Sequence, residues 1–494
     1  MAIKQMTLMQ RVSSGNKKFE VSGDIIVPDI KPDIVSITTS NANTYIYKEE
    51  ISTGKIRVDG NIDAYIIYIS DSGETRSIQT TLDFVETIND EKAEENKRLL
   101  TGVKLEFLEA KVLNERKINI TASLNIDYQI MEKENLSINM DFEEIGNVQR
   151  LTEKTKLACL IGENKVRTSV KEDLKLDGDG DEDAGEILKV DLRIENSDVK
   201  TSYNKVLAKA EAKVQIIYLT ENGKIKKIES SIPIMSFIDI ANIEETHNCD
   251  VNYRVRNMLV KINNKEMHSI NFQTEFEVYC VATQNEEILL TKDMYSMNKE
   301  LELENGRMTI CQEKSVEEKS IKISEKIALE NPDKVYDIQT NPKITNSTQN
   351  GEMINYEGEV EVAVYYTAVH SNNLNIKQVK IPFIKSTTSI ITTSDLTVVN
   401  SRFSITGEEV NVEFEIVVKN NSLTTSEITY ISNVTVKEEA KESDYNMFVY
   451  FVKSGDTIWK IAKKFKVDMQ SIIELNHLEN PDKINVGDRL YIIK

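Results

Sequence analysis

The sequence predicts a mainly β protein, in which three antiparallel, sandwich-like β units are followed by a small module of order β-α-α-β. Two observations carry this prediction. Through most of the chain, apolar and polar residues alternate with a period of two, and the alternating segments recur at the spacing of a whole domain. Near the C-terminus, apolar residues change to a helical spacing between two short alternating segments.

A tyrosine-containing strand marks each repeat. It ends at Tyr68 in the first copy, at Tyr218 in the second and at Tyr366 in the third, so the copies lie 150 and 148 residues apart. In the first two copies the strand is followed by Asp71–Gly73 and by Glu221–Gly223, whose glycines supply the positive φ angle of a tight hairpin. The period is therefore that of a domain and not that of a short solenoid repeat.

Two further alternating segments flank this strand in every unit. Each has the pattern of a strand with one buried and one solvated face. The segments before and after the tyrosine strand are Lys18–Ile25 and Lys117–Tyr128 in unit one. They are Lys165–Val170 and Ser269–Tyr279 in unit two, and Ser320–Ile327 and Glu409–Val418 in unit three. A Pro-Asp turn follows the first segment in units one and three, at Pro28–Asp29 and Pro332–Asp333.

The repeats also predict where the units begin and end. We expect helices only at two stretches of the repeats, Asp90–Leu100 and Arg150–Ile161. A stretch rich in Glu, Lys and Ser, Lys437–Ser443, is expected to be a short solvated linker. The expected domains are residues 1–149, 150–298 and 299–440 for the three β units, and residues 445–494 for the C-terminal module.

Charge, cysteines and hydropathy limit the partners and the compartment. Lys and Arg number 61 against 81 Asp and Glu, and this net charge of −20 argues against nucleic acid and against an anionic membrane surface. The four cysteines are far apart and form no C-x-x-C pair, which indicates reduced thiols: Cys159, Cys249, Cys280 and Cys311. The N-terminus has no apolar signal region and no run is long enough for a transmembrane segment, so we expect synthesis in the cytosol.

No catalytic pattern recurs in the repeats. The four histidines share no motif, and none occupies the same place in two units: His247, His268, His370 and His477. The sequence contains no G-x-S-x-G, H-E-x-x-H, P-loop or G-x-G-x-x-G motif. We therefore expect a protein that is not an enzyme and that carries no cofactor. A hydrolase with a carboxylate pair among the many Asp and Glu residues is the remaining alternative.

One acidic run, Asp177–Asp183, has some features of a calcium loop. An EF-hand loop that starts at Asp177 needs Gly at its sixth position and Glu at its twelfth. Glu182 and Leu188 occupy these positions. We therefore expect a solvated acidic loop and no metal site, with loose cation binding as the open alternative.

The C-terminal module has clear signals for each of its elements. Asp456 or Thr457 can cap the first helix, and Asp468 can cap the second. The expected elements are a strand at Phe448–Lys453, a turn at Ser454–Thr457, a helix that contains Ile458, Ile461, Ala462 and Phe465, a second helix with Ile472, Ile473 and Leu475, a loop at Asn480–Lys483 and a strand at Arg489–Ile493.

This module resembles a LysM domain. The resemblance rests on Gly455–Trp459, followed by Ile461-Ala462, Leu475-Asn476, and Ile484, Gly487 and Leu490 at the downstream spacing. It implies a groove that binds glycans containing N-acetylglucosamine, or a protein partner. The implied groove is formed by Gly455, Asp456, Thr457, Ile458, Trp459, Asn480, Pro481, Asp482, Lys483 and Ile484. Two alternatives stay open: Asp456 and Thr457 merely cap the helix, and Trp459 packs in a core instead of offering a contact surface.

The repeats resemble SPOCS domains of spore coat proteins from endospore-forming Gram-positive bacteria. The first unit carries the match on Phe19–Val21, Pro28–Ile34, Gly54–Gly60 and Tyr65–Tyr68. The second unit lacks the Pro-Asp pair, and the third keeps only Asn331–Lys334 of that region. SPOCS-like units followed by one LysM domain resemble clostridial coat morphogenetic proteins of the SipL type.

The family resemblance implies an adaptor in spore coat assembly. Such a protein binds the coat basement-layer ATPase, stage IV sporulation protein A, in the mother-cell cytoplasm on the forespore surface. A LysM domain on that side does not meet the cortex, so we expect it to dock a protein. The alternative is a peptidoglycan-binding protein that tethers the coat to cortex or cell wall. Self-association through strand edges also stays open.

Overall fold

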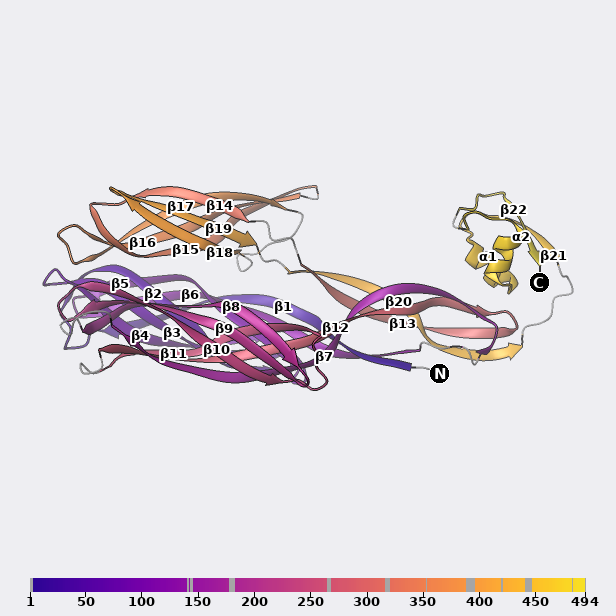
Figure 1. The fold of residues 1–494 in the computed structure, drawn as a ribbon, viewed down its shortest axis with the longest axis horizontal. Coiled ribbons are helices and arrows are strands. Elements are labelled where there is room, and N and C mark those ends of the chain that lie inside the picture. The colour runs from indigo at the N-terminus through magenta and orange to yellow at the C-terminus, as the bar shows by residue number, and fades with distance from the viewer. Residues whose placement is uncertain are drawn as a thin grey trace.

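The computed structural model describes residues 3–139, 142, 145–176, 183–263, 268–315, 320–351, 353–387, 396–418, 421–439, 447–481 and 483–493. It is an elongated molecule (Figure 1). Three β sandwiches, here called the heads, lie together at one end. A narrower β stalk extends from them, and the small C-terminal module lies at the far end of the stalk.

Each head is a sandwich of two three-stranded antiparallel sheets. In the first unit, one sheet has the order β2-β3-β4 and the other the order β1-β6-β5. Every second residue of β6 from Ile118 to Ile130 is buried, as the period-two pattern predicts. The strands of this unit are β1 (Ile3–Ile26), β2 (Ile34–Ser52), β3 (Lys55–Ser70), β4 (Thr75–Asn89), β5 (Arg98–Asn114) and β6 (Lys117–Asn139).

The second unit repeats this arrangement. Its sheets have the order β8-β9-β10 and β11-β12-β7, and the second of these joins the β1 sheet of unit one through one paired position, Leu8–Cys159 of β1 and β7. The strands are β7 (Val148–Lys175), β8 (Ala184–Ser202), β9 (Lys205–Thr220), β10 (Ile225–Asp239), β11 (Asn248–Ile262) and β12 (Ser269–Ser296).

In the third unit, each of the two long strands is divided in two. The head has sheets of order β15-β16-β17 and β14-β19-β18, and β13 pairs with β20 outside the head. The strands are β13 (Lys299–Ser315), β14 (Ile321–Ala328), β15 (Pro332–Asn350), β16 (Met353–Ala368), β17 (Leu374–Thr387), β18 (Leu396–Thr406), β19 (Glu409–Val418) and β20 (Asn421–Glu439).

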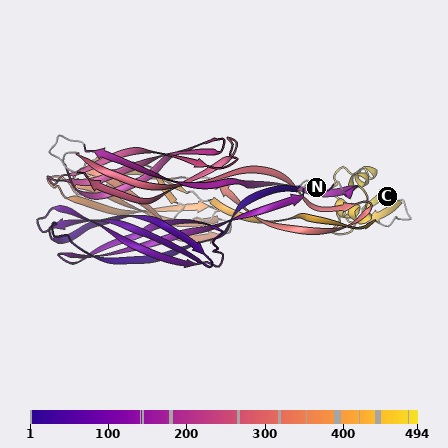
Figure 2. The same ribbon diagram turned by 90° about the horizontal axis from the view of Figure 1, so that it is seen from below.

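The stalk consists of the ends of these long strands. Pairing of β1 with β6 continues outward to Ile3 and Asn139, pairing of β7 with β12 to Val148 and Ser296, and β13 pairs with β20 throughout. The three ribbons run side by side away from the heads (Figure 2). Their shared core is formed by Met6, Leu8, Leu136, Ile138, Leu157, Cys159, Ile288, Leu290, Met308 and Tyr430.

The C-terminal module has the predicted order β-α-α-β. Side chains of α1 and of the inner sheet face form its core, which includes Ile461, Ala462 and Ile492. Its elements are β21 (Met447–Phe451), α1 (Ile458–Phe465), α2 (Met469–Leu475) and β22 (Arg489–Ile493). The predicted fold class, three antiparallel sandwich-like units followed by this module, is therefore confirmed. The residue limits of the individual domains stay the predictions made above.

The two helices expected in the repeats are wrong. Residues 90–97 form turns, β5 starts at Arg98, and the stretch from Arg150 to Ile161 lies within β7. Leu157 and Cys159 are two residues apart and both face the stalk core, so the period of two outweighs the weak helical pattern. Of the expected linker, residues 437–439 belong to β20 and residues 440–443 lie outside the described residues.

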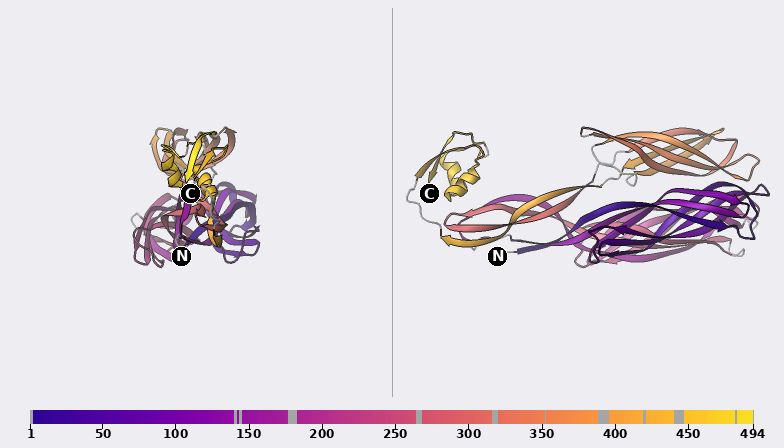
Figure 3. Two further views of the ribbon diagram at one scale, coloured as in Figure 1. Left: turned by 90° about the vertical axis from the view of Figure 1, so that its right-hand side faces the viewer. Right: turned by 180° about the vertical axis from the view of Figure 1, so that it is seen from behind.

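The three heads surround a common axis, which the end-on view shows most clearly (Figure 3, left). Ile67, Ile217 and Tyr365 occupy the same position in β3, β9 and β16, one residue before the tyrosines that mark the repeat. All three are buried and belong to one cluster between the heads. The repeated strands thus build the head-to-head contact with equivalent residues.

A lysine of the second head is buried at this axis. Lys189 lies opposite Ile217 in the β8–β9 pair, and its side chain is 2% exposed. Its Nζ forms ion pairs with Asp191, at 2.5 Å, and with Asp337 of the third head, and it lies 4.7 Å from the ring centroid of Tyr365. Burial would raise the pKa of the Asp337 carboxyl, but the Lys189 ammonium holds it below its ordinary value.

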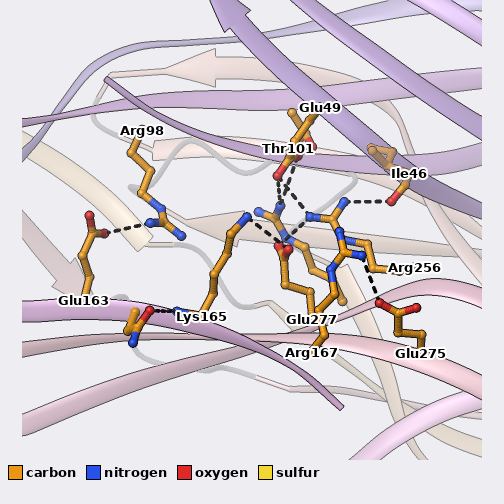
Figure 4. A network of polar contacts seen from close by, with 12 residues as sticks. Ile46, Glu49, Arg98, Thr101, Glu163, Lys165, Arg167, Arg256, Glu275 and Glu277 are labelled. Carbon is orange, nitrogen blue, oxygen red and sulfur yellow. Dashed lines mark hydrogen bonds and ion pairs between the residues drawn. The ribbon is translucent and has the colours of Figure 1, made fainter. Parts of the chain in front are cut away.

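A second charged network joins heads one and two (Figure 4). The guanidinium of Arg256 on β11 donates to Glu277 at 2.5 Å, to Glu49 on β2 at 3.2 Å and to the carbonyl of Ile46 at 2.8 Å. Lys165 on β7 reaches Glu277 at 3.1 Å. Burial would raise the pKa of Glu277, but the ion pairs with Arg256 and Lys165 hold it below its ordinary value.

The axis lysine gives a stability prediction. Replacing Lys189 by Met leaves Asp191 and Asp337 without their cation inside the head contact, and we expect a loss of about 3–5 kcal/mol in the free energy of unfolding. Chemical unfolding followed by circular dichroism measures it. The matched control is Lys213→Met on β9, because the Lys213 ion pair with Glu195 is half exposed. Equal destabilisation by both substitutions would contradict the assigned role of Lys189.

The lowered pKa values of Glu277 and Asp337 give a pH prediction. Carboxyls with a depressed folded pKa contribute stability at neutral pH that is lost as the pH falls through the folded value. We expect the free energy of unfolding to decrease when the pH falls below about 4.5. We expect Glu277→Gln to be less stable than the parent protein at pH 7 and to lose less stability on acidification. Unfolding at a series of pH values tests this. Glu50→Gln at an exposed ion pair should keep the parental profile.

Candidate functional site

The first wall of the implied LysM groove is the turn between β21 and α1. Gly455 has a φ of +83°, a left-handed conformation that favours glycine. The Asp456 carboxylate accepts hydrogen bonds from the Lys453 amide and the Tyr450 hydroxyl, both at 2.8 Å, and these bonds lower its pKa. Thr457 is the N-cap of α1 and accepts from the Lys460 amide at 3.2 Å. Asp456 and Thr457 thus shape the turn and the helix start.

The second wall is the loop before β22. The Lys483 amide donates to the carbonyl of Asn480 at 3.1 Å, which closes a turn. Asn480 and Lys483 are exposed, Pro481 is half-buried, and Ile484 packs against the core of the module. Asp482 lies outside the described residues. Gly455 and Thr457 of the first wall are also exposed, so the polar residues that would form the rim of the implied groove are open to solvent.

The two large apolar residues of the implied groove are not part of this open rim. Ile458 is 2% exposed and lies in the core of the module. Trp459 is 9% exposed and contacts the stalk: its indole Nε1 donates to Asp293 at 2.8 Å, and its ring meets the ring of Tyr295 edge-on, with centroids 5.1 Å apart. Of the two interpretations left open by the sequence, the structure therefore shows Trp459 packed and not freely exposed.

Residues of α1 and the residues that directly follow it extend this contact, here called the dock. Lys463 forms an ion pair with Asp293 at 2.5 Å, and Lys466 forms one with Glu300 on β13. The hydroxyl of Tyr295 donates to the carbonyl of Val467 at 2.6 Å. Burial raises the pKa of Tyr295, so this hydroxyl stays protonated and remains a donor. The dock holds the C-terminal module against the end of β12.

The sequence alone did not identify the stalk half of the dock. Tyr295 and Met297 belong to the hydrophobic cluster of the C-terminal module, although more than 150 residues separate them from its helices. The alternating pattern indicates only that this strand has a buried face. It carries no signal about which distant element covers that face.

Neither a metal centre nor a reactive thiol emerges among the described residues. No group of three or more His, Cys, Asp or Glu side chains in this part of the chain could hold a metal ion. Residues 177–182 of the acidic run lie outside the described residues, and Asp183 contacts His268. Burial raises the pKa of Cys159 and Cys249, and that of Cys280 to about 12, which disfavours thiolate at neutral pH. The Cys311 side chain lies outside the described set.

Comparisons with protein families agree with this architecture. A family model described as LysM domain matches residues 450–492, and one described as SipL, SPOCS domain matches residues 33–113 and 183–263. The two SPOCS matches lie in the first and second β units. The fold and the matches together define a protein of SPOCS and LysM domains. In its domain composition the chain is of the SipL type, as the sequence predicted.

Two curated proteins share shorter segments with this chain. An endolysin of Bacillus phage B103 is 36% identical over 69 residues, which are 14% of this chain and 25% of the endolysin. The uncharacterized protein YkzQ of Bacillus subtilis (strain 168) is 46% identical over 44 residues, 9% of this chain and 57% of YkzQ. The matches therefore span only a quarter and little more than half of these relatives. No solved structure matches the chain.

The two domain families indicate the general role of the protein. The matches support a sporulation protein associated with the spore coat, with a C-terminal module of the LysM type, the type found in peptidoglycan-binding proteins. Neither helix of the described part of the chain has the length and apolar character needed to cross a membrane.

The dock can be followed by fluorescence, because Trp459 is the only tryptophan of the chain. Tyr295→Ala removes the ring that contacts Trp459 and the hydroxyl that donates to the carbonyl of Val467, and Asp293→Ala removes the acceptor of the indole and the partner of Lys463. We expect either substitution to expose Trp459 and to move its emission to longer wavelength.

The matched control is Glu302→Ala, which removes an exposed ion pair with Lys437 in the same stalk. It should leave the emission unchanged. Unaltered emission in Tyr295→Ala and Asp293→Ala would mean that the C-terminal module does not rest on β12.

Proposed function

We propose that this protein is a non-enzymatic adaptor of spore coat assembly. It links stage IV sporulation protein A, the ATPase of the coat basement layer, to the forming coat on the forespore surface, from the mother-cell cytoplasm. The LysM domain serves as the docking module for that partner. The proposal rests on the SipL-type domain composition and extends it to one partner and one compartment.

One structural observation carries the proposal. The C-terminal module lies at the end of the stalk and is fixed there through α1, while the rim residues Thr457, Asn480 and Lys483 stay exposed. A groove that is open while the module is docked offers a partner a surface that needs no rearrangement of the stalk. The heads, at the opposite end, remain free to contact other coat components (Figure 3, right).

A second candidate function is a tether between the coat and peptidoglycan. The LysM family match and the similarity to a phage endolysin favour it. The open rim is polar, and the apolar residues Ile458 and Trp459 are buried, so the groove lacks an exposed aromatic platform for a sugar face. This absence, seen among the described groove residues, makes a protein partner the better occupant.

The test measures binding of the full chain to two probes, purified stage IV sporulation protein A and purified cortex peptidoglycan. Thr457→Asp keeps an N-cap residue and adds a charge to the rim, and Lys483→Glu reverses the charge of the other wall. We expect each substitution to weaken binding of the ATPase at least tenfold.

The control is Lys377→Glu, an equivalent charge reversal at an exposed position of β17 in the third head. It should leave binding unchanged. Cosedimentation with peptidoglycan that depends on the same rim residues, without binding of the ATPase, would support the tether and overturn the proposed partner.

A further inference from the structure

The sheet of the C-terminal module has an unusual outer face. In β21 and β22 the outward positions form three cross-strand pairs, Met447–Ile493, Val449–Tyr491 and Phe451–Arg489. Five of these six residues are apolar and between 43% and 57% exposed. The opposite face is also apolar, because it packs on the helices. A two-stranded sheet with one solvated face normally carries polar residues there, so this apolar face needs a partner.

The position of this outer face separates it from the contacts already described. The dock uses Trp459 and Lys463 of α1 and the C-cap residue Lys466, and the inner sheet residues Leu490 and Ile492 pack on the helices. The outer face therefore points away from the helices. It also differs from the groove rim, whose walls are the loops at the ends of the strands. Among the described residues, neither the dock nor the walls of the implied groove use the side chains of this face.

We propose that the outer face of β21 and β22 binds the same face of a second copy of this chain, so that two rods join end to end through their C-terminal modules. A flat apolar face can pack on its own copy around a two-fold axis, which gives a closed contact. Val449 and Tyr491 form the middle pair and lie nearest that axis. Arg489 lies at one end of the ladder, where its guanidinium keeps contact with water.

The distribution of charge along the chain favours a second copy as the partner of this face. Residues 447–494 contain eight Lys and Arg and six Asp and Glu, a net charge of +2, which leaves −22 for the rest of a chain whose total is −20. Side-by-side association would bring two strongly acidic bodies together. Contact through the C-terminal modules keeps these bodies at opposite ends of the assembly and joins only the parts that are nearly neutral.

The size of the face sets the strength of the contact. Half-exposed apolar side chains of this size leave roughly 100 Å² each accessible, so the pair of faces buries about 1,000 Å² in total. Specific interfaces bury roughly 1,200–2,000 Å², so this contact lies just below the lower end of that range. We therefore expect a reversible dimer that forms at high local concentration, as on a surface where the protein accumulates.

Sedimentation of the full chain over a range of concentrations tests the association, and small-angle scattering tests its geometry. We expect a monomer–dimer equilibrium in which the dimer has almost twice the maximum dimension of the monomer. Val449→Lys and Tyr491→Lys place a cation at the centre of the contact and should raise the dissociation constant at least tenfold. Unchanged Trp459 emission shows that the module of each variant is folded and docked.

The matched control is Ile30→Lys, at a side chain that is 92% exposed in the turn between β1 and β2, at the head end of the molecule. It should leave the dimer unchanged. Three results would overturn the proposal: a chain that stays monomeric at high concentration, a dimer of unchanged maximum dimension, or association weakened by Ile30→Lys and not by Val449→Lys. Loss of binding to stage IV sporulation protein A in a monomeric Val449→Lys variant would assign the face to that partner instead.

Discussion

Pairing of the first and last strands of units one and two, which continues from head to stalk across local register shifts, is the constraint on which the rest of the molecule depends. The β7–β12 ladder runs from Lys175–Ser269 in the second head to Val148–Ser296 at the end of the stalk. Because one set of hydrogen bonds spans head and stalk, the two parts cannot rotate against each other without breaking paired backbone groups. The third unit divides its ladder between β14–β19 and β13–β20, so contacts with the other heads position its head. Tyr295, near the end of β12, lies on the longest of these ladders and there holds the C-terminal module.

Because the three heads have similar folds, each could pack against the others through several equivalent surfaces. Different residues at equivalent positions distinguish these surfaces. The position opposite Ile67, Ile217 and Tyr365 is occupied by Thr39, Lys189 and Asp337. Only the second and third heads therefore carry opposite charges at this position. Burying these charges costs solvation free energy, and a wrong pairing would leave a charge uncompensated. We infer that the charged axis contributes to the choice of neighbours, while the apolar residues around it supply most of the contact free energy.

The fold was predictable wherever a local period determines it. Every second residue of β6 is buried as expected, and the cap residues Thr457 and Asp468 begin their helices as expected. The helix expected over Arg150–Ile161 failed because burial of Leu157 and Cys159 depends on the neighbouring ribbons of the stalk, which a local pattern does not contain. The dock could not be predicted for the same reason, because it joins segments that are far apart in the sequence. Asp293 and Tyr295 look like ordinary strand residues, and their role appears only when β12 reaches the C-terminal module.

The dock changes what a LysM domain can do in this protein. A module on a free linker transmits no force or orientation to the body, whereas here Trp459, Lys463 and Lys466 join it to the two strands that end the stalk. Under the proposed function, a partner bound at the implied groove would therefore be held at a fixed angle to the heads. Using Trp459 for this contact removes the large aromatic surface of the module from the groove, so recognition there falls to polar rim groups and backbone atoms. Such a site discriminates by hydrogen-bond geometry more than by buried apolar area, which is consistent with the proposed docking of a structured protein partner.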